Sequence, residues 1–151
     1  MTETGTSLNV HFTLSNHVDG TLLDNVRKLL EMAARSEDLK GELGVWLCSD
    51  DEIADLHVRF MDVPGATDVI TFPEEPEPGG YLGDIAVSTD TAASQAADAG
   101  HSTEREIAYL CLHGLLHIAG YDDLDDNSRN AMIHRQDELM IAFERENPGV
   151  W

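Results

Sequence analysis

The chain has 151 residues, of which 42% are hydrophobic and 25% are charged, a composition typical of one folded domain and not of a disordered or fibrous chain. It carries 29 acidic residues against 9 lysines and arginines, which gives a formal net charge of −20 and argues against broad electrostatic binding to nucleic acids or anionic membranes. No stretch approaches the roughly 18 consecutive apolar residues of a membrane helix, and the first residues do not resemble a signal peptide. We therefore expect a single cytoplasmic domain over residues 1–151 that does not associate with membranes.

The first half of the chain alternates predicted strands with predicted helices. Alternating apolar and polar residues predict a half-buried strand over 8–14, and apolar residues at helical spacing predict a helix after it. A second strand is expected over 43–48. The helix that follows it is expected to bury Ile53, Leu56 and Phe60.

The second half begins with two predicted strands and continues with helices. The strands cover 67–72 and 81–87, and an acidic connection rich in proline and glycine joins them. A short helix is expected over 89–99, and the next, over about 103–119, is apolar nearly all round and should be buried. The last helix runs from about 127 to 144. This order predicts an α+β fold: a small mixed β-sheet of about four strands, packed with about five helices around a central buried helix that bears histidines.

Two of these histidines have the spacing of metal ligands. His113 and His117 lie one turn apart on the predicted buried helix, so both project from one face. Gly120 can adopt the left-handed conformation that ends a helix, and the reversal would bring Asp123 towards the imidazoles. Two histidines and a carboxylate form a sound ligand set for zinc. The alternative is a pair of core histidines followed by a solvated acidic loop, and the cost of burying unpaired imidazoles favours the metal site.

The same spacing matches the HExxHxxGxxH signature of metalloproteases, but two positions differ. Gly114 stands in the place of the glutamate, and Asp123 stands in the place of the third histidine. Proteases of this class need the glutamate as general base, and Gly114 has no side chain. The sequence therefore disfavours a protease.

The run HGLLHIAGYDD, from His113 to Asp123, closely resembles the HGxLHLxGYDH signature of the YbeY family of bacterial metal-dependent endoribonucleases. Three further segments resemble segments of that family in the same order. They are LHVRF from Leu56, TDVITFP from Thr67 and YLGDIAVS from Tyr81. The resemblance covers most of the chain.

The resemblance implies an α+β fold, a zinc-like ion and cleavage of single-stranded RNA. It also implies a role in small-subunit ribosomal RNA maturation and ribosome quality control, with the ribosome or ribosome-associated proteins as partners. Carried over by position, His113 and His117 are metal ligands, Asp123 takes the place of the third ligand, and all three act catalytically through the metal-bound water. The chain departs from the family at Asp123 and at Met61, where many members have an arginine.

Four other residues are candidates for substrate binding. Asp84 could orient a ligand histidine, line the substrate groove or only cap a strand, and Thr71 could contact a phosphate or only favour a strand. Arg27 and Lys28 form a cationic cluster with Arg35 and Lys40 on and near the first predicted helix, which we expect RNA to cross. His134 could replace a lost metal ligand or be an ordinary surface histidine.

With this resemblance, the sequence is expected to encode a hydrolytic endoribonuclease in which one divalent ion, zinc, lowers the pKa of a water molecule and stabilises charge on the attacked phosphate. The alternative is a non-catalytic ribosome-assembly or binding factor with a structural or vestigial metal. The departures at Asp123 and Met61 are the features that favour this alternative.

Overall fold

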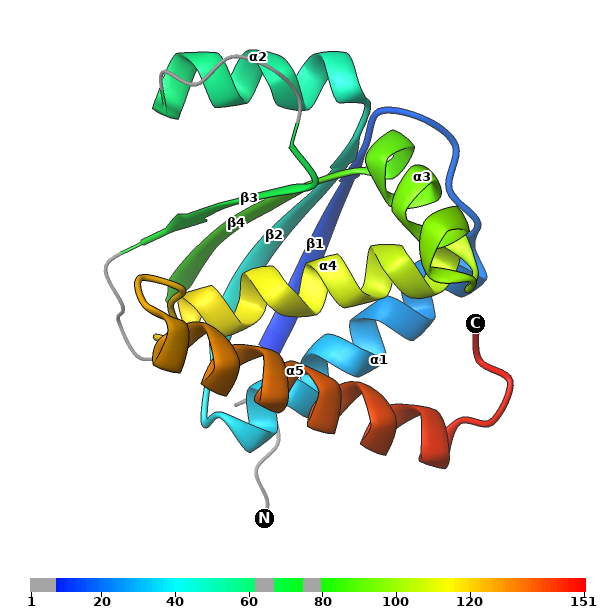
Figure 1. The fold of residues 1–151 in the computed structure, drawn as a ribbon, viewed down its shortest axis with the longest axis vertical. Coiled ribbons are helices and arrows are strands. Elements are labelled where there is room, and N and C mark those ends of the chain that lie inside the picture. Colours follow the sequence, from blue (N-terminus) through cyan, green and yellow to red (C-terminus); the bar gives the residue numbers. More distant parts are fainter. Residues whose placement is uncertain (1–7, 62–66, 75–79) are drawn as a thin grey trace.

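The computed structural model describes residues 8–61, 67–74 and 80–151 (Figure 1). Four strands and five helices are formed in these residues, and they confirm the predicted α+β fold. The elements are β1 (Leu8–Leu14), α1 (Gly20–Ser36), β2 (Gly41–Cys48), α2 (Asp50–Met61), β3 (Val69–Pro73), β4 (Tyr81–Ser88), α3 (Thr89–Ala99), α4 (Thr103–Ile118) and α5 (Asp126–Glu146). None of the helices in the described residues has the length and apolar character needed to cross a bilayer.

The strands form one mixed sheet in the order β1-β2-β4-β3. Strand β2 is parallel to β1 and to β4, whereas β3 is antiparallel to β4, with Thr71 opposite Ile85. The acidic connection between β3 and β4 lies largely outside the described residues. The sheet therefore combines two crossover connections with one antiparallel pair at its β3 edge.

The two faces of the sheet are covered unequally (Figure 1). Helix α2 lies alone on one face, where Ile53 packs with Ile70 and Ala86. The other four helices lie on the opposite face, with α4 against the sheet and α5 outside it. Most of the buried apolar residues belong to this second side. The histidine-bearing helix α4 is therefore sandwiched between the sheet and α5, as a buried central helix was predicted to be.

Helix α4 approaches strand β4 closely because residue 114 has no side chain. A Cβ atom built on Gly114 would lie 2.7 Å from Cγ2 of Ile85 and 2.9 Å from its Cδ1. Real Cβ atoms do not come this close to carbon, so any larger residue must push the helix or the isoleucine aside. Gly114 thus sets the distance between the sheet and the histidines.

The predicted burial of Phe60 is wrong. Its side chain is 64% exposed, and its ring meets that of Phe72 edge to face with the centroids 5.5 Å apart. Ile53 is buried in α2, whereas Leu56 is half-buried. A cavity of about 440 Å³ lies where the later turns of α2 face Trp46 and Phe72. Helical periodicity placed Phe60 on the correct side of α2, but that part of the helix is not packed tightly on the sheet.

We predict that Gly114→Ala lowers the free energy of unfolding by about 1–3 kcal/mol, because the added methyl group overlaps Ile85. Urea denaturation measures this change. In an Ile85→Ala background the same substitution should cost less, since the overlapping atoms are gone. An equal cost in both backgrounds would contradict the proposed contact.

Candidate functional site

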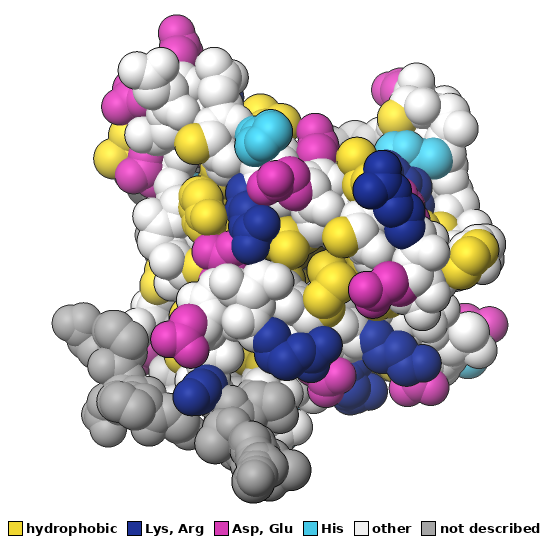
Figure 2. Space-filling view, turned by 90° about the horizontal axis from the view of Figure 1, so that it is seen from below, with side chains coloured by type: hydrophobic (Ala, Val, Ile, Leu, Met, Phe, Trp, Pro, Cys, Tyr) yellow, Lys and Arg dark blue, Asp and Glu magenta, His cyan; other side chains and the backbone are white. Residues whose placement is uncertain are grey.

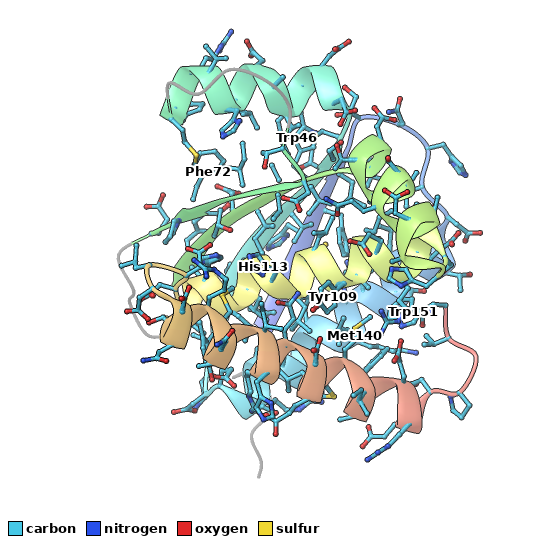
Figure 3. The ribbon with its side chains drawn as sticks, viewed as in Figure 1. Trp46, Phe72, Tyr109, His113, Met140 and Trp151 are labelled. Carbon is cyan, nitrogen blue, oxygen red and sulfur yellow. The ribbon has the colours of Figure 1, made fainter. Side chains whose placement is uncertain are left out.

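The two histidines of the motif form a close pair on α4. The ring centroids of His113 and His117 lie 4.9 Å apart, and the ring planes make an angle of 81°. Their spacing of four residues puts both rings on one face of the helix, as predicted. His113 lies in the C-terminal half of α4, which leads into the loop before α5 (Figure 3). The paired imidazoles therefore mark one end of the buried helix.

A glutamine of the neighbouring helix α5 contacts His113. Gln136 is 1% exposed, and its Oε1 atom lies 3.0 Å from Nδ1 of His113. The Nε2 amide group of Gln136 donates to the backbone carbonyl of Tyr109, 3.0 Å away. A histidine that ligates a metal through one nitrogen commonly donates its other N–H to a fixed acceptor of this kind. The surroundings of His113 therefore have the form expected around a metal ligand.

The turn after α4 contacts His117. Gly120 has a φ of +111° and donates to the carbonyl of His117 at 3.1 Å, while Tyr121 donates to the carbonyl of Leu116 at 3.0 Å. These two bonds form the Schellman motif, which ends a helix at a glycine. The turn also brings the Tyr121 backbone into a hydrogen bond with the His117 side chain. The chain reversal predicted at Gly120 is present.

Burial lowers the pKa of His117 below its ordinary value of 6.5, and the nearby His113 lowers it further. Asp123 acts in the opposite direction, because its negative charge favours the protonated ring. The lowering effects prevail, so His117 is neutral at neutral pH. Neutral imidazole is the form that can donate a lone pair to a metal ion.

Asp123 lies in the exposed loop between α4 and α5. It is near enough to act electrostatically on His117. Across residues 8–61, 67–74 and 80–151, however, no three His, Cys, Asp or Glu side chains are grouped so that they could hold a metal ion. His134 is exposed and lies 3.7 Å from Glu138 on its own helix. The two imidazoles fit a metal ion, and Asp123 would have to approach them to complete a set of three.

Thr71 and Asp84 lie on opposite faces of the sheet. Thr71 is opposite Ile85 in the ladder, so it shares the face on which Ile85 meets α4. Asp84 faces the α2 side, where it accepts a hydrogen bond from Tyr81 and lines the cavity beside Trp46. The suggestion that Asp84 orients a ligand histidine is therefore wrong, because the sheet separates it from α4. Its alternative role, lining a groove, agrees with its position.

Arg27 and Lys28 lie on α1, whose neighbour in the sheet is the edge strand β1. The guanidinium of Arg27 lies 5.1 Å from the centre of the Phe12 ring and 3.6 Å from a carboxylate oxygen of Asp24. Lys28 is exposed and has no ion-pair partner in the described residues. Strands β2 and β4 separate β1 from β3, so this cluster and Thr71 are at opposite edges of the sheet. Met61, which is 45% exposed, ends α2 on the other face.

The family model for endoribonuclease YbeY matches residues 9–144. The chain belongs to the endoribonuclease YbeY family. The endoribonuclease YbeY of Thermobifida fusca is 43% identical over 113 residues, which are 69% of this chain and 73% of that protein. The protein of the same name from Staphylococcus epidermidis is 38% identical over 138 residues, which are 83% of this chain and 89% of the relative.

The solution structure of TM1509 from Thermotoga maritima is similar to this chain with a TM-score of 0.68. The two are 28% identical, and the match covers 93% of this chain and 94% of that one. This structure confirms the α+β fold, and the YbeY matches confirm the family and the hydrolytic nuclease class that the resemblance implied.

Gln136 is a residue of the site that the sequence analysis did not identify. The signal was a polar residue inside an apolar stripe, because positions 132, 136, 139 and 143 recur at helical spacing and all four are buried. A polar residue in such a stripe needs a buried hydrogen-bond partner. The sequence alone could not say that the partner is His113.

We predict that the metal-free chain loses stability as the pH falls below about 6.5, partly through His117. The folded pKa of His117 is lowered, so the unfolded chain binds this proton first and acid favours unfolding. His117→Gln should make the free energy of unfolding less dependent on pH between about 7.5 and 5.5. His134→Gln, on the exposed face of α5, is the control and should leave the dependence unchanged. Parallel curves for wild type and His117→Gln would contradict this prediction.

Proposed function

We propose that this chain is a zinc-dependent endoribonuclease that cleaves single-stranded RNA. The observation that supports it most is the half-buried histidine pair, in which each imidazole already has one hydrogen-bond partner, Gln136 or the Tyr121 backbone. Membership of the YbeY family supplies the reaction class. The lone pairs of His113 and His117 suit a divalent ion of the first transition row, to which imidazole binds well.

Asp123 is our proposed third ligand, and with His113 and His117 it would hold one zinc ion. When bound, such an ion lowers the pKa of a water molecule and stabilises negative charge on a phosphate. The histidines and Asp123 then act in catalysis by holding that ion in place. Thr71 shares the α4 face of the sheet and is the proposed contact for a substrate phosphate, whereas Asp84 could contact RNA only from the opposite face.

The distribution of charge determines how strongly this enzyme would bind RNA. Of its nine lysines and arginines, five form ion pairs with partners in the described part of the chain: Arg27, Arg59, Arg105, Arg129 and Arg135. Figure 2 shows the cationic side chains of one face lying among acidic ones instead of forming a continuous track. Binding to naked RNA depends on several phosphate contacts, so we expect it to be weak. The proposed substrate is therefore ribosomal RNA presented by the ribosome or its associated proteins, in the cytoplasm, during small-subunit maturation and quality control.

A non-catalytic ribosome-assembly factor is the second candidate function. The position of Asp123 favours it, because a carboxylate in an exposed loop binds metal less firmly than a third ligand that is already in place. Such a factor would bind metal, if at all, without cleaving RNA. Metal analysis and RNA cleavage by the same preparation separate the two functions.

We predict that Asp123→Asn lowers zinc affinity at least about tenfold and lowers metal-dependent cleavage of single-stranded RNA in parallel, because a negative ligand is lost. Asp123→His should retain zinc, since imidazole is a good zinc ligand. Asp98→Asn, on the exposed surface of α3, is the matched control. Elemental analysis gives the metal content, and casein tests for proteolysis.

Unchanged zinc affinity in Asp123→Asn would show that Asp123 is not a ligand. Loss of zinc in a folded Asp123→His would contradict the position assigned to the third ligand. Zinc binding without RNA cleavage in the wild type would favour the assembly factor.

We predict that neutralising Arg27 and Lys28 together, as Arg27→Gln and Lys28→Gln, weakens binding to single-stranded RNA and leaves zinc content unchanged, because both lie on α1 away from the histidines. Filter binding at two salt concentrations measures the change. Arg59→Gln with Arg145→Gln removes the same charge from exposed positions on α2 and α5 and is the control. If both double variants lose equal affinity, the effect is one of net charge and no RNA path crosses α1.

A further inference from the structure

A buried amide joins α4 to α5 at the histidine pair. Gln136 lies on the inner face of α5 between Met132 and Met140, all of them almost completely buried. An unpaired amide here would destabilise the folded chain, because a buried polar group would lose its hydrogen bonds to water without replacing them. Both ends of the Gln136 side chain are paired, with Tyr109 and with His113. The amide is therefore fixed by helix α4.

The contact with Tyr109 determines which way the amide points. A backbone carbonyl can only accept a hydrogen bond, so the NH₂ group of Gln136 must face it. The Oε1 atom is then the one that faces His113, and because it too can only accept, His113 must donate from Nδ1. In neutral imidazole a proton on Nδ1 leaves the lone pair on Nε2. The hydrogen bonds therefore select one tautomer of His113.

A second contact holds the two helices in this register. The hydroxyl of Tyr109 donates to Oδ1 of Asp137 at 2.9 Å. Tyr109 thus binds two successive residues of α5, one through its carbonyl and one through its side chain. Sliding or rotation of α5 past α4 would break both bonds together. The position of the Gln136 acceptor is determined by packing as well as by its own hydrogen bonds.

We propose that Gln136 is a positioning residue that keeps His113 in the Nδ1–H tautomer and so reserves its Nε2 lone pair for the metal ion. The proposal rests on the proposed function only in naming His113 as a ligand. A methionine at 136 would fill nearly the same volume in the stripe without any acceptor for Nδ1–H. Packing therefore does not require a glutamine at this position, whereas the control of a ligand tautomer does.

The test compares Gln136→Met with Gln136→Glu, and Leu139→Met is the control because it is a volume-conserving change on the same buried stripe. Long-range nitrogen–proton NMR spectra of metal-free protein report which nitrogen of His113 carries the proton. We expect Nδ1–H in the wild type and in the control, and also in Gln136→Glu, where a carboxylate oxygen can still accept from Nδ1 although the bond to the Tyr109 carbonyl is lost. In Gln136→Met we expect the proton to redistribute to Nε2.

Zinc affinity is the second measurement, made by competition with a chromophoric chelator. Gln136→Met should bind zinc about 10–100-fold more weakly, as found when partners of ligand histidines are removed, and Gln136→Glu should be close to the wild type. Circular dichroism checks that each variant is folded. A Gln136→Met protein that keeps both the wild-type tautomer and the wild-type zinc affinity would overturn the proposal, as would Nε2–H in the wild type.

The two proposals fail in different ways. A wild type that binds no zinc contradicts the proposed function, while a change of tautomer in Gln136→Met still shows that Gln136 controls His113. A wild type that binds zinc while Gln136→Met binds it equally well contradicts the positioning role alone. If Gln136→Met does not fold, loss of the Nδ1–H signal in folded Gln136→Glu overturns the proposal and its retention supports it.

Discussion

The contact between Gly114 and Ile85 is the constraint on which the rest of the site depends. Helix α4 can lie this close to β4 only where its surface lacks a side chain. Helix α4, which carries His113 and His117 before and after Gly114, is then held between the sheet and α5. Gly114 stands where a metalloprotease has its general base, and the same residue determines how close the two imidazoles lie to the sheet. The absence of a side chain at position 114 therefore affects both the packing of α4 and the chemistry available at the site.

The two histidines are held by different means. His113 depends on tertiary structure, because its partner comes from another helix and is fixed by Tyr109. His117 depends on local structure, because the Schellman turn at Gly120 delivers the Tyr121 backbone to it. The third candidate, Asp123, has neither support and is exposed. The site is therefore rigid on the helix and weakly constrained in the loop.

Features that depend on neighbouring residues in the chain could be predicted from the sequence. Apolar periodicity predicted the buried helix, and the spacing of His113, His117 and Gly120 predicted a histidine pair followed by a chain reversal. The sequence did not show how the strands and helices lie relative to one another. Strand alternation shows that Asp84 and Ile85 face opposite ways, but not which of the two faces meets α4. In the same way, helical spacing groups Phe60 with Ile53 but does not show how far the sheet extends beneath α2.

The dependence of His113 on α5 couples metal chemistry to the stability of the outermost helix. Proteins open locally with free energies below that of global unfolding, and terminal helices belong to the elements that open first. Every excursion that lifts α5 from α4 removes the acceptor from Nδ1 of His113 and frees the ring to exchange its proton between nitrogens. If the proposed ion binds through Nε2 of His113, it would in turn favour the closed arrangement, because only that arrangement holds the ring in the ligating tautomer. Metal binding at the proposed site and the docking of α5 on α4 would therefore stabilise each other.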